Sequence, residues 1–169
     1  MGKFGSAVMD PVRKLSSIDS RREQIANSSD LSLRRRLPRV LVVDDNPNTM
    51  SLMHDLLSTR GYDVVAVPDA VQAEAEIMRR VPDVILSDVI MPGKSGYELC
   101  RELKENPATR LIPFVLITGL SEREDRVRGI EAGADDFLSK PIFPEELFAR
   151  VKSLIKLKEF TDELETAES

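Results

Sequence analysis

The chain has 169 residues, of which 41% are hydrophobic and 31% are charged, as in an ordinary soluble domain. This length fits one globular domain with additional tails. Collagen-like, disulfide-rich and membrane-spanning classes are excluded, because one cysteine cannot form an internal disulfide and no apolar run approaches the roughly 20 residues that a bilayer requires. We therefore expect a cytoplasmic protein with no membrane partner.

The net charge of −5 is unevenly distributed along the chain. Residues 1–40 hold nine Lys and Arg against four Asp and Glu, whereas residues 41–169 hold fifteen against twenty-five. The apolar residues near the beginning are too scattered to form a long buried face. We interpret residues 1–37 as a basic arm or linker. Nucleic acid is disfavoured as its partner, because no aromatic side chains are interleaved with its arginines.

From residue 39 onward, short apolar, β-branched runs alternate with stretches of helical periodicity. Strands are predicted at residues 40–43, 64–67, 84–86, 114–117 and 137–138. Helices are predicted at residues 47–61, 70–82, 97–106, 122–132 and from 144 onward, where apolar residues recur three and four positions apart. Ala70, Ala73, Ile77 and Met78 form the predicted apolar stripe of the second helix. This alternation predicts an α/β fold with a doubly wound, five-stranded parallel sheet.

Polar side chains stand at the carboxyl ends of four predicted strands. Asp44 and Asp45 follow the first strand, Asp88 follows the third, and Thr118 and Lys140 close the fourth and fifth. In such sheets the functional site lies beyond these ends, so the side chains should meet in one crevice. Clustered carboxylates repel one another unless a cation lies between them, and oxygen ligands suit Mg²⁺. With a lysine and a hydroxyl donor nearby, the set predicts phosphoryl chemistry on a carboxylate nucleophile.

Four sequence blocks resemble the receiver domain of two-component response regulators. They stand at residues 42–46, 87–93, 118–119 and 133–141, with the family's order and spacing. The resemblance implies a flavodoxin-like (βα)5 fold over residues 38–156. It also implies a phosphorylation-activated signalling switch rather than an enzyme, although such a domain would catalyse its own phosphotransfer and slow dephosphorylation.

The resemblance also assigns a phosphoacceptor and a metal site. Asp88 is expected to take a phosphoryl group from a phosphohistidine of a sensor histidine kinase or phosphotransfer protein. Asp44 and Asp45 are expected to bind Mg²⁺ together with Asp88 and the main-chain carbonyl of Ile90.

Three further residues are expected to respond to the phosphoryl group. By resemblance, Lys140 pairs with its oxygens and Thr118 swings to donate a hydrogen bond to them. Phe137 occupies the family's aromatic switch position, three residues before the lysine, and would move inward after Thr118. Phosphorylation adds about −1.5 to −2 charges and can bias such a two-state element.

Two positions that influence hydrolysis of the acyl phosphate in this family are occupied here by Ile90 and Leu120. Both side chains are apolar, so neither can orient a hydrolytic water, and their bulk should shield the phosphoryl group. We therefore expect slow dephosphorylation.

The last predicted helix continues beyond the receiver. Leu157, Phe160 and Leu164 extend its three- and four-residue spacing, so we interpret residues 157–169 as a coiled-coil linker to an output domain that is not present. The linker resembles those that precede HD-GYP or diguanylate cyclase domains. Two interpretations stay open, a piece of a cyclic-di-GMP regulator and a receiver with an ordinary long terminal helix, and in both the extended helix could support a homodimer.

Two alternative functions stay open. A binding-only receiver would act by dimerisation or protein contact without phosphate, although Asp88, Thr118 and Lys140 are all present. An aspartyl-phosphate hydrolase of the haloacid dehalogenase type would use similar groups, but it places two acids in an Asp-x-Asp motif, whereas the acids here are adjacent. His54 is interpreted as a solvated side chain and Cys100 as a buried core thiol.

Overall fold

The structure is a computed structural model that describes residues 37–119 and 123–168. The predicted basic arm lies outside the described residues except for Leu37, and so does Leu120. Within residues 38–169, which form one compact unit, the elements are β1 (Arg39–Val43), α4 (Pro47–Thr59), β2 (Asp63–Val67), α5 (Ala70–Arg79), β3 (Val84–Asp88), α6 (Gly96–Glu105), β4 (Phe114–Thr118), α7 (Arg123–Ala132), β5 (Asp136–Ser139) and α8 (Pro144–Glu168).

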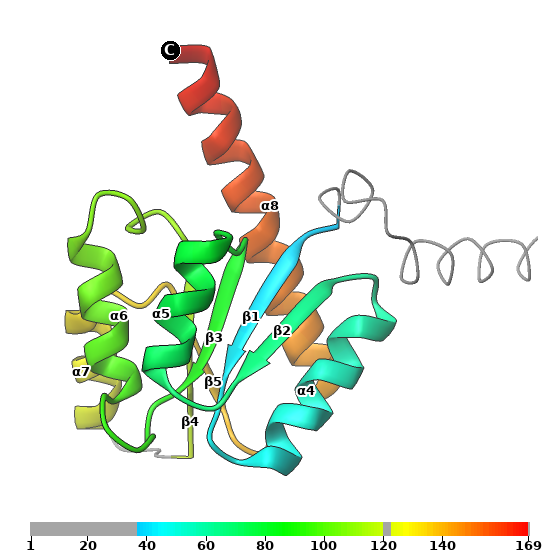
Figure 1. The fold of residues 1–169 in the computed structure, drawn as a ribbon, viewed down its shortest axis with the longest axis vertical. Coiled ribbons are helices and arrows are strands. Elements are labelled where there is room, and N and C mark those ends of the chain that lie inside the picture. Colours follow the sequence, from blue (N-terminus) through cyan, green and yellow to red (C-terminus); the bar gives the residue numbers. More distant parts are fainter. Residues whose placement is uncertain (1–36, 120–122, 169) are drawn as a thin grey trace, which may run out of the picture. The chain divides into compact units, whose positions relative to one another are not determined.

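The five strands form one parallel sheet in the order β2-β1-β3-β4-β5 (Figure 1). Connections from one strand to the next run through a helix, and the strand order reverses direction beside β1. This topology confirms the doubly wound parallel sheet that the sequence predicts.

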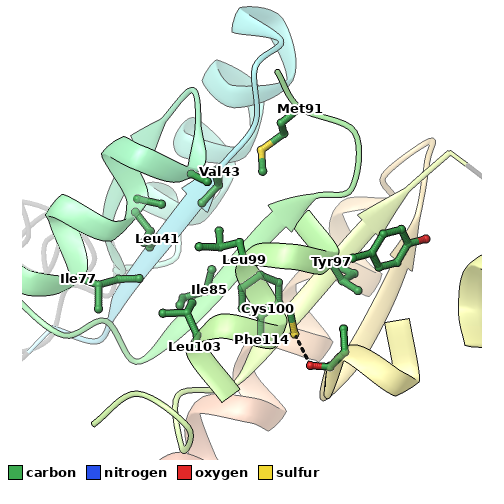
Figure 2. Packing of buried hydrophobic residues seen from close by; sticks show 14 of the residues in the cluster. Leu41, Val43, Ile77, Ile85, Met91, Tyr97, Leu99, Cys100, Leu103 and Phe114 are labelled. Atoms are coloured by element: carbon green, nitrogen blue, oxygen red, sulfur yellow. Dashed lines mark hydrogen bonds between the residues drawn. The ribbon is translucent and has the colours of Figure 1, made fainter. Parts of the chain in front are cut away.

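Alternate side chains of each strand point to opposite faces of the sheet and build two cores. Leu41 and Val43 pack with α5 and α6 in the first core, whereas Val40 and Val42 pack with α4 and α8 in the second. Figure 2 shows the first core, where side chains of β1, β3 and β4 gather against those of α5 and α6. Because both faces are covered, the central strands read as continuous apolar runs.

Polar side chains cap three helices at the edge where the strands end. The side chains of Asn46, Asp69 and Ser95 accept backbone N–H groups in the first turns of α4, α5 and α6. These hydrogen bonds satisfy donors that have no partner within the helix, so they fix where each helix begins.

Several element bounds and the burial of one side chain differ from the sequence prediction. β3 and β4 are longer than expected and include Asp88 and Thr118 as their last residues. Met78 does not belong to the buried stripe of α5: it is 86% exposed, whereas Ala70, Ala73 and Ile77 are buried. The prediction for Met78 was wrong because α5 covers the sheet with one narrow face, and the residue after Ile77 is rotated away from it.

Among the described helices, none is both long and apolar enough to cross a bilayer.

Candidate functional site

The predicted site residues meet at the carboxyl edge of the sheet. Asp44 follows β1, Asp88 ends β3, Thr118 ends β4 and Lys140 follows β5. These strands are neighbours, and the register pairs Asp88 with Ile117 and Thr118 with Ser139. The parallel arrangement therefore brings together residues that lie up to 96 positions apart in the sequence.

Three carboxylates form an acidic cluster at this edge. One oxygen each from Asp44, Asp45 and Asp88 lies within 4.8 Å of the other two. Asp44 and Asp88 are buried, with 1% and 7% of their surface exposed, while Asp45 is exposed to solvent. The cluster is therefore buried at Asp44 and Asp88 and exposed to solvent at Asp45.

A buried carboxylate oxygen of Asp44 indicates a binding site for a cation. Its Oδ1 accepts the backbone N–H of Asn46 at 2.9 Å, whereas its buried Oδ2 accepts no hydrogen bond from the residues described. Burial raises the pKa of Asp44, and the neighbouring charge of Asp88 raises it further. An incompletely satisfied, oxygen-only ligand set fits Mg²⁺, which binds through a few carboxylates and keeps several waters.

Lys140 supplies the positive charge of the site. Its Nζ donates a hydrogen bond to Oδ2 of Asp88 at 3.2 Å and lies 3.8 Å from Oδ2 of Asp44. About a third of the lysine side chain is exposed. Its backbone N–H donates to the carbonyl of Thr118 at 2.9 Å, which ties the end of β5 to the end of β4. The lysine is therefore fixed at its backbone while its ammonium group faces the acidic cluster.

Thr118 and Phe137 lie on the two strands that follow β3 in the sheet, β4 and β5. Thr118 is buried, and Phe137 on β5 is partly buried against the first core. A Cβ atom added to Gly129 of α7 would stand only 2.3 Å from the Phe137 ring, so the absent side chain of this glycine leaves the space for the ring. Ile90 follows β3 with 66% of its surface exposed.

The residues interpreted as having no chemical role are ordinary in the structure. His54 is exposed and lies 3.4 Å from the carboxylate of Asp55. Cys100 is fully buried, its thiol donates to the carbonyl of Ala132, and burial raises the thiol pKa to about 12. Both observations agree with the sequence interpretation.

Sequence reasoning missed two residues that position the loop after Asp88. A Cβ at Gly96 would lie 2.2 Å from the carbonyl oxygen of Asp88, so only glycine lets α6 begin this close to the strand. Lys94 donates to Glu74 of α5 at 2.7 Å and to Glu102 of α6. The sequence contains no signal for either contact.

The described fold and acidic edge define a class of protein, the CheY-like receivers with a flavodoxin-like sheet. A family model of the response regulator receiver domain matches residues 40–152. The chain therefore belongs to the response regulator receiver family, whose members are phosphorylation-dependent signalling domains rather than dedicated enzymes. Receiver domains bind Mg²⁺ in their acidic site and are phosphorylated by histidine kinases or phosphotransfer proteins.

Three similar proteins illustrate the membership. The response regulator PleD of Caulobacter vibrioides is 48% identical over 131 residues, which are 78% of this chain and 29% of PleD. The phosphate regulon transcriptional regulatory protein PhoB of Escherichia coli is 40% identical over 70% of this chain and 52% of PhoB. The receiver domain of a Pseudomonas aeruginosa sensor histidine kinase, solved with magnesium in its active-site cleft, is 31% identical with a TM-score of 0.66, and the match covers 71% of this chain and 98% of that one.

The matched region is shorter than the two curated relatives. The chain spans less than a third of PleD and about half of PhoB. Membership of the family therefore shows that residues 40–152 form a receiver domain, a type of domain that acts as a phosphorylation-dependent switch.

Proposed function

We propose that Asp88 accepts a phosphoryl group from a histidine kinase or phosphotransfer protein in a Mg²⁺-dependent reaction. The observation that carries this proposal is the position of Lys140, whose Nζ lies 3.2 Å from Oδ2 of Asp88 inside the acidic cluster. A carboxylate beside a fixed ammonium group can attack phosphorus while the charge that develops on the phosphoryl oxygens is neutralised.

Asp44, Asp45, Asp88 and the main-chain carbonyl of Ile90 would hold the Mg²⁺ ion. When bound, the ion supplies charge neutralisation for the phosphoryl oxygens. Asp44 offers its unsatisfied Oδ2, and the exposed Asp45 leaves an entry path from solvent. Lys140 would exchange its contact with Asp88 for one with the transferred phosphoryl group.

The switch would operate through Thr118 and Phe137. Thr118 ends the strand next to Asp88, so its hydroxyl can turn toward an oxygen of the phosphoryl group. This movement frees space at the end of β4, and Phe137 on the adjacent strand would move inward to fill it. The output is a shift in the population of two conformations of the face around Phe137. Ile90 and Leu120 would slow the loss of the phosphoryl group.

Intact-mass spectrometry after treatment with acetyl phosphate and Mg²⁺ tests the proposal. We expect one phosphoryl adduct on the wild-type chain, and none on Asp88→Asn or in the presence of EDTA. If the folded wild type gives no adduct, a phosphohistidine donor is tried next. Failure with both donors contradicts the proposal and favours the binding-only receiver.

We also propose a wider role for the chain, as the receiver part of a signalling protein. Residues 38–156 would be the receiver of a cytoplasmic protein, and residues 157–169 would transmit its state to an output domain. The course of α8, which stays helical to Glu168, supports a transmitting role. Cyclic-di-GMP output rests on the resemblance of this linker alone. A homodimer through α8 is part of this proposal, and the exposure of Leu157, Phe160 and Leu164 supports it.

A further inference from the structure

The loop at residues 89–95 connects β3 to α6 and directly follows the proposed phosphoacceptor; we call it the site loop. Its first residue is fixed by the backbone, because the N–H of Val89 donates to the carbonyl of Ile117 at 3.1 Å and its carbonyl accepts the N–H of Gly96 at 2.8 Å. Ile90 has 66% of its surface exposed, so its side chain provides no anchor. The position of the Ile90 main chain therefore depends on what holds the middle of the loop.

Met91 and Lys94 anchor the middle of the site loop. Met91 is buried against the first core, with 7% of its surface exposed (Figure 2). A methionine side chain has three rotatable bonds and adapts to irregular gaps, so its burial alone leaves the backbone room to shift. Gly93, between the two anchors, has a φ of 76°, a conformation that glycine adopts easily. The direction of the loop therefore depends mainly on Lys94.

Lys94 ties the site loop to two helices. Its Nζ donates to Oε1 of Glu74 on α5 at 2.7 Å and to Oε2 of Glu102 on α6. The hydrogen bonds to Glu102 and Glu74 raise the pKa of Lys94, so its ammonium group stays charged at neutral pH. One side chain of the loop is thus held from both α5 and α6.

These ion pairs are partly exposed and add little to the stability of the fold. The side chains of Glu74 and Glu102 are 40% and 52% exposed, and exposed pairs contribute about 0–1 kcal/mol each. An ammonium group held by a carboxylate on each of two helices restrains the loop in more than one direction. The two pairs therefore affect where the loop lies more than how stable the fold is.

We propose that Lys94 is a positioning residue of the cation site, which holds the main-chain carbonyl of Ile90 where Mg²⁺ accepts a ligand. This inference rests on the proposed function, from which it takes the metal site and the Ile90 carbonyl. Mg²⁺ demands nearly octahedral geometry with oxygens at about 2.0–2.1 Å, so a small displacement of one ligand weakens binding. Lys94 acts through the site loop, because both carboxylates that bind its ammonium group lie outside the acidic cluster.

Charge and position make opposite predictions for Lys94→Met. Methionine keeps the length and the apolar stem of lysine but loses the positive charge. Removal of a positive charge from the surroundings of a cation site favours cation binding by electrostatics alone. Release of the site loop weakens the same binding. The sign of the change in Mg²⁺ affinity therefore separates positioning from a simple effect of charge.

Isothermal titration calorimetry of the full chain with magnesium chloride, at an ionic strength of about 0.15 M and without a phosphodonor, tests the proposal. We expect Lys94→Met to raise the dissociation constant of Mg²⁺ by about tenfold, as loss of an outer contact does at other metal sites. Lys94→Arg should stay within about threefold of the wild type, because a guanidinium group can donate to both carboxylates. Urea unfolding in EDTA checks that each variant is folded.

Lys158→Met is the matched control for charge. It removes the same charge and also breaks an ion pair, since Lys158 donates to Asp162 at 2.6 Å. Lys158 lies on the part of α8 that runs past the amino ends of the strands (Figure 1), whereas the acidic cluster lies at their carboxyl ends. Salt screens charges beyond about 8 Å, so its dissociation constant for Mg²⁺ should stay within about twofold of the wild type.

Glu102→Gln keeps the proposal testable if Lys94→Met does not fold. It should raise the dissociation constant of Mg²⁺ by about threefold, because Lys94 loses one of its two charged partners. Glu105→Gln is the matched variant: it removes the same charge from the same helix, leaves both partners of Lys94 in place and should change the affinity little. Equal effects of the two glutamine variants would contradict the proposal.

The dependence of phosphorylation on Mg²⁺ distinguishes positioning from a direct role in phosphoryl transfer. With acetyl phosphate, Lys94→Met should need about ten times more Mg²⁺ for half of its maximal rate of adduct formation, and should reach the wild-type rate at saturating Mg²⁺. A rate that stays low at saturation would place Lys94 in the transfer step and contradict a positioning role.

Two results of the calorimetry would overturn the proposal. One is a Lys94→Met variant that binds Mg²⁺ at least as tightly as the wild type. The other is a Lys158→Met variant that loses as much affinity as Lys94→Met. A wild-type chain that binds no Mg²⁺ would overturn both this inference and the Mg²⁺ dependence of the proposed function. A wild-type chain that binds Mg²⁺ but forms no adduct with either donor would overturn the proposed function alone.

Discussion

At the scale of single residues, we expect the buried carboxylate of Asp44 to lower the free energy of unfolding of the metal-free protein. Its carboxylate is almost fully buried next to Asp88, and Oδ2 has only a distant lysine as a counter-charge. We predict that Asp44→Asn stabilises the metal-free protein at pH 7 by about 1–2 kcal/mol, the range in which single substitutions commonly act. Urea unfolding of both proteins in EDTA measures the difference.

The effect of Asp44→Asn should depend on pH and on Mg²⁺. Since the pKa of Asp44 is raised in the fold, its contribution is favourable below the ordinary value of 3.8 and is lost as pH rises through the raised value. The advantage of the Asn variant should therefore shrink as pH falls toward 4. At ten times its dissociation constant, Mg²⁺ should stabilise the wild type by about 1.4 kcal/mol and the variant much less. An equal response of both proteins to Mg²⁺ would remove Asp44 from the site.

Gly96 lies so close to the backbone of Asp88 and Val89 that a side chain would not fit there. The Cβ atom of an alanine would lie 2.2 Å from the carbonyl oxygen of Asp88 and 3.0 Å from the Cα atom of Val89, and neither backbone atom can turn away as a side chain does. We predict that Gly96→Ala costs about 1–3 kcal/mol and slows phosphoryl incorporation several-fold, because the backbone that carries Asp88 must move. Urea unfolding and the rate of adduct formation measure the two effects.

Gly119→Ala provides the matched control for stability. Gly119 also stands beside the site, but a Cβ there meets nothing within 4 Å. We expect its unfolding free energy to stay within about 0.5 kcal/mol of the wild type. A similar loss in both variants would mean that glycine flexibility, and not the contact with Asp88, makes Gly96 necessary.

We expect Ile90 and Leu120 to affect the rate of dephosphorylation rather than the stability of the fold. The side chain of Ile90 is largely exposed beside Asp88, where an apolar group can neither bind nor orient an attacking water. We predict that Ile90→Asn combined with Leu120→Glu shortens the lifetime of the phosphorylated protein by about tenfold or more, in line with the effect of a positioned polar group. The decay of the adduct mass measures this lifetime, and an unchanged lifetime contradicts the prediction.

At the scale of elements, α7 and β5 pack closely together where Gly129 of α7 leaves room for the Phe137 ring of β5. Gly129 lies in the middle of α7, where alanine would ordinarily favour the helix by about 1 kcal/mol. Its Cβ would nevertheless lie 2.3 Å from Cε1 and 2.7 Å from Cζ of Phe137. We predict that Gly129→Ala destabilises the wild type by about 1–3 kcal/mol, and that this cost falls by at least about 1 kcal/mol when Phe137 is also replaced by alanine.

A double-mutant cycle in urea measures this coupling. The four proteins are the wild type, Gly129→Ala, Phe137→Ala and the double variant, so the loss of the ring itself cancels from the interaction energy. If Gly129→Ala costs the same with and without the ring, α7 does not hold Phe137.

The elements themselves could be predicted because burial on both faces leaves a strong sequence pattern. Residues 40–43 of β1 form an unbroken apolar run, and its end is marked by Asp44 and Asp45. Parallel strands then bring Asp88, Thr118 and Lys140 to one edge whatever the details of packing. The positions of Asp44, Asp88, Thr118 and Lys140 therefore followed from strand order, whereas Ile90 and Phe137 were singled out by the resemblance to the receiver family.

Contacts between elements could not be predicted in the same way. Lys94 reaches Glu74 twenty positions away, and Gly129 makes room for a ring on another strand. Met78 was misplaced because the apolar pattern of a short helix does not show how wide its buried face is. These two contacts and the exposure of Met78 depend on how separate elements pack against one another. The spacing of residues within one segment carries no information about that packing.

At the scale of the whole molecule, the amino-terminal boundary of the receiver is set by contacts of two residues. The carbonyl of Pro38 accepts the N–H of Asp63 at 2.9 Å. Arg39 is buried, its N–H donates to Asp83 at 2.7 Å, and its guanidinium donates to Glu76 at 2.9 Å. These bonds tie the start of β1 to β2, to α5 and to the turn before β3.

We therefore predict that a chain beginning at Pro38 keeps the stability of the full chain within about 0.5 kcal/mol and forms the same phosphoryl adduct, because the described contacts that fix the start of β1 are made by Pro38 and Arg39. A chain beginning at Val40 should lose about 2–4 kcal/mol, since it leaves the buried side of Glu76 and the carboxylate of Asp83 without their partner. Urea unfolding of the three chains measures both steps. A loss on the first deletion as large as on the second would place part of the receiver's stability in the basic arm, and the domain boundary would then move toward the amino terminus.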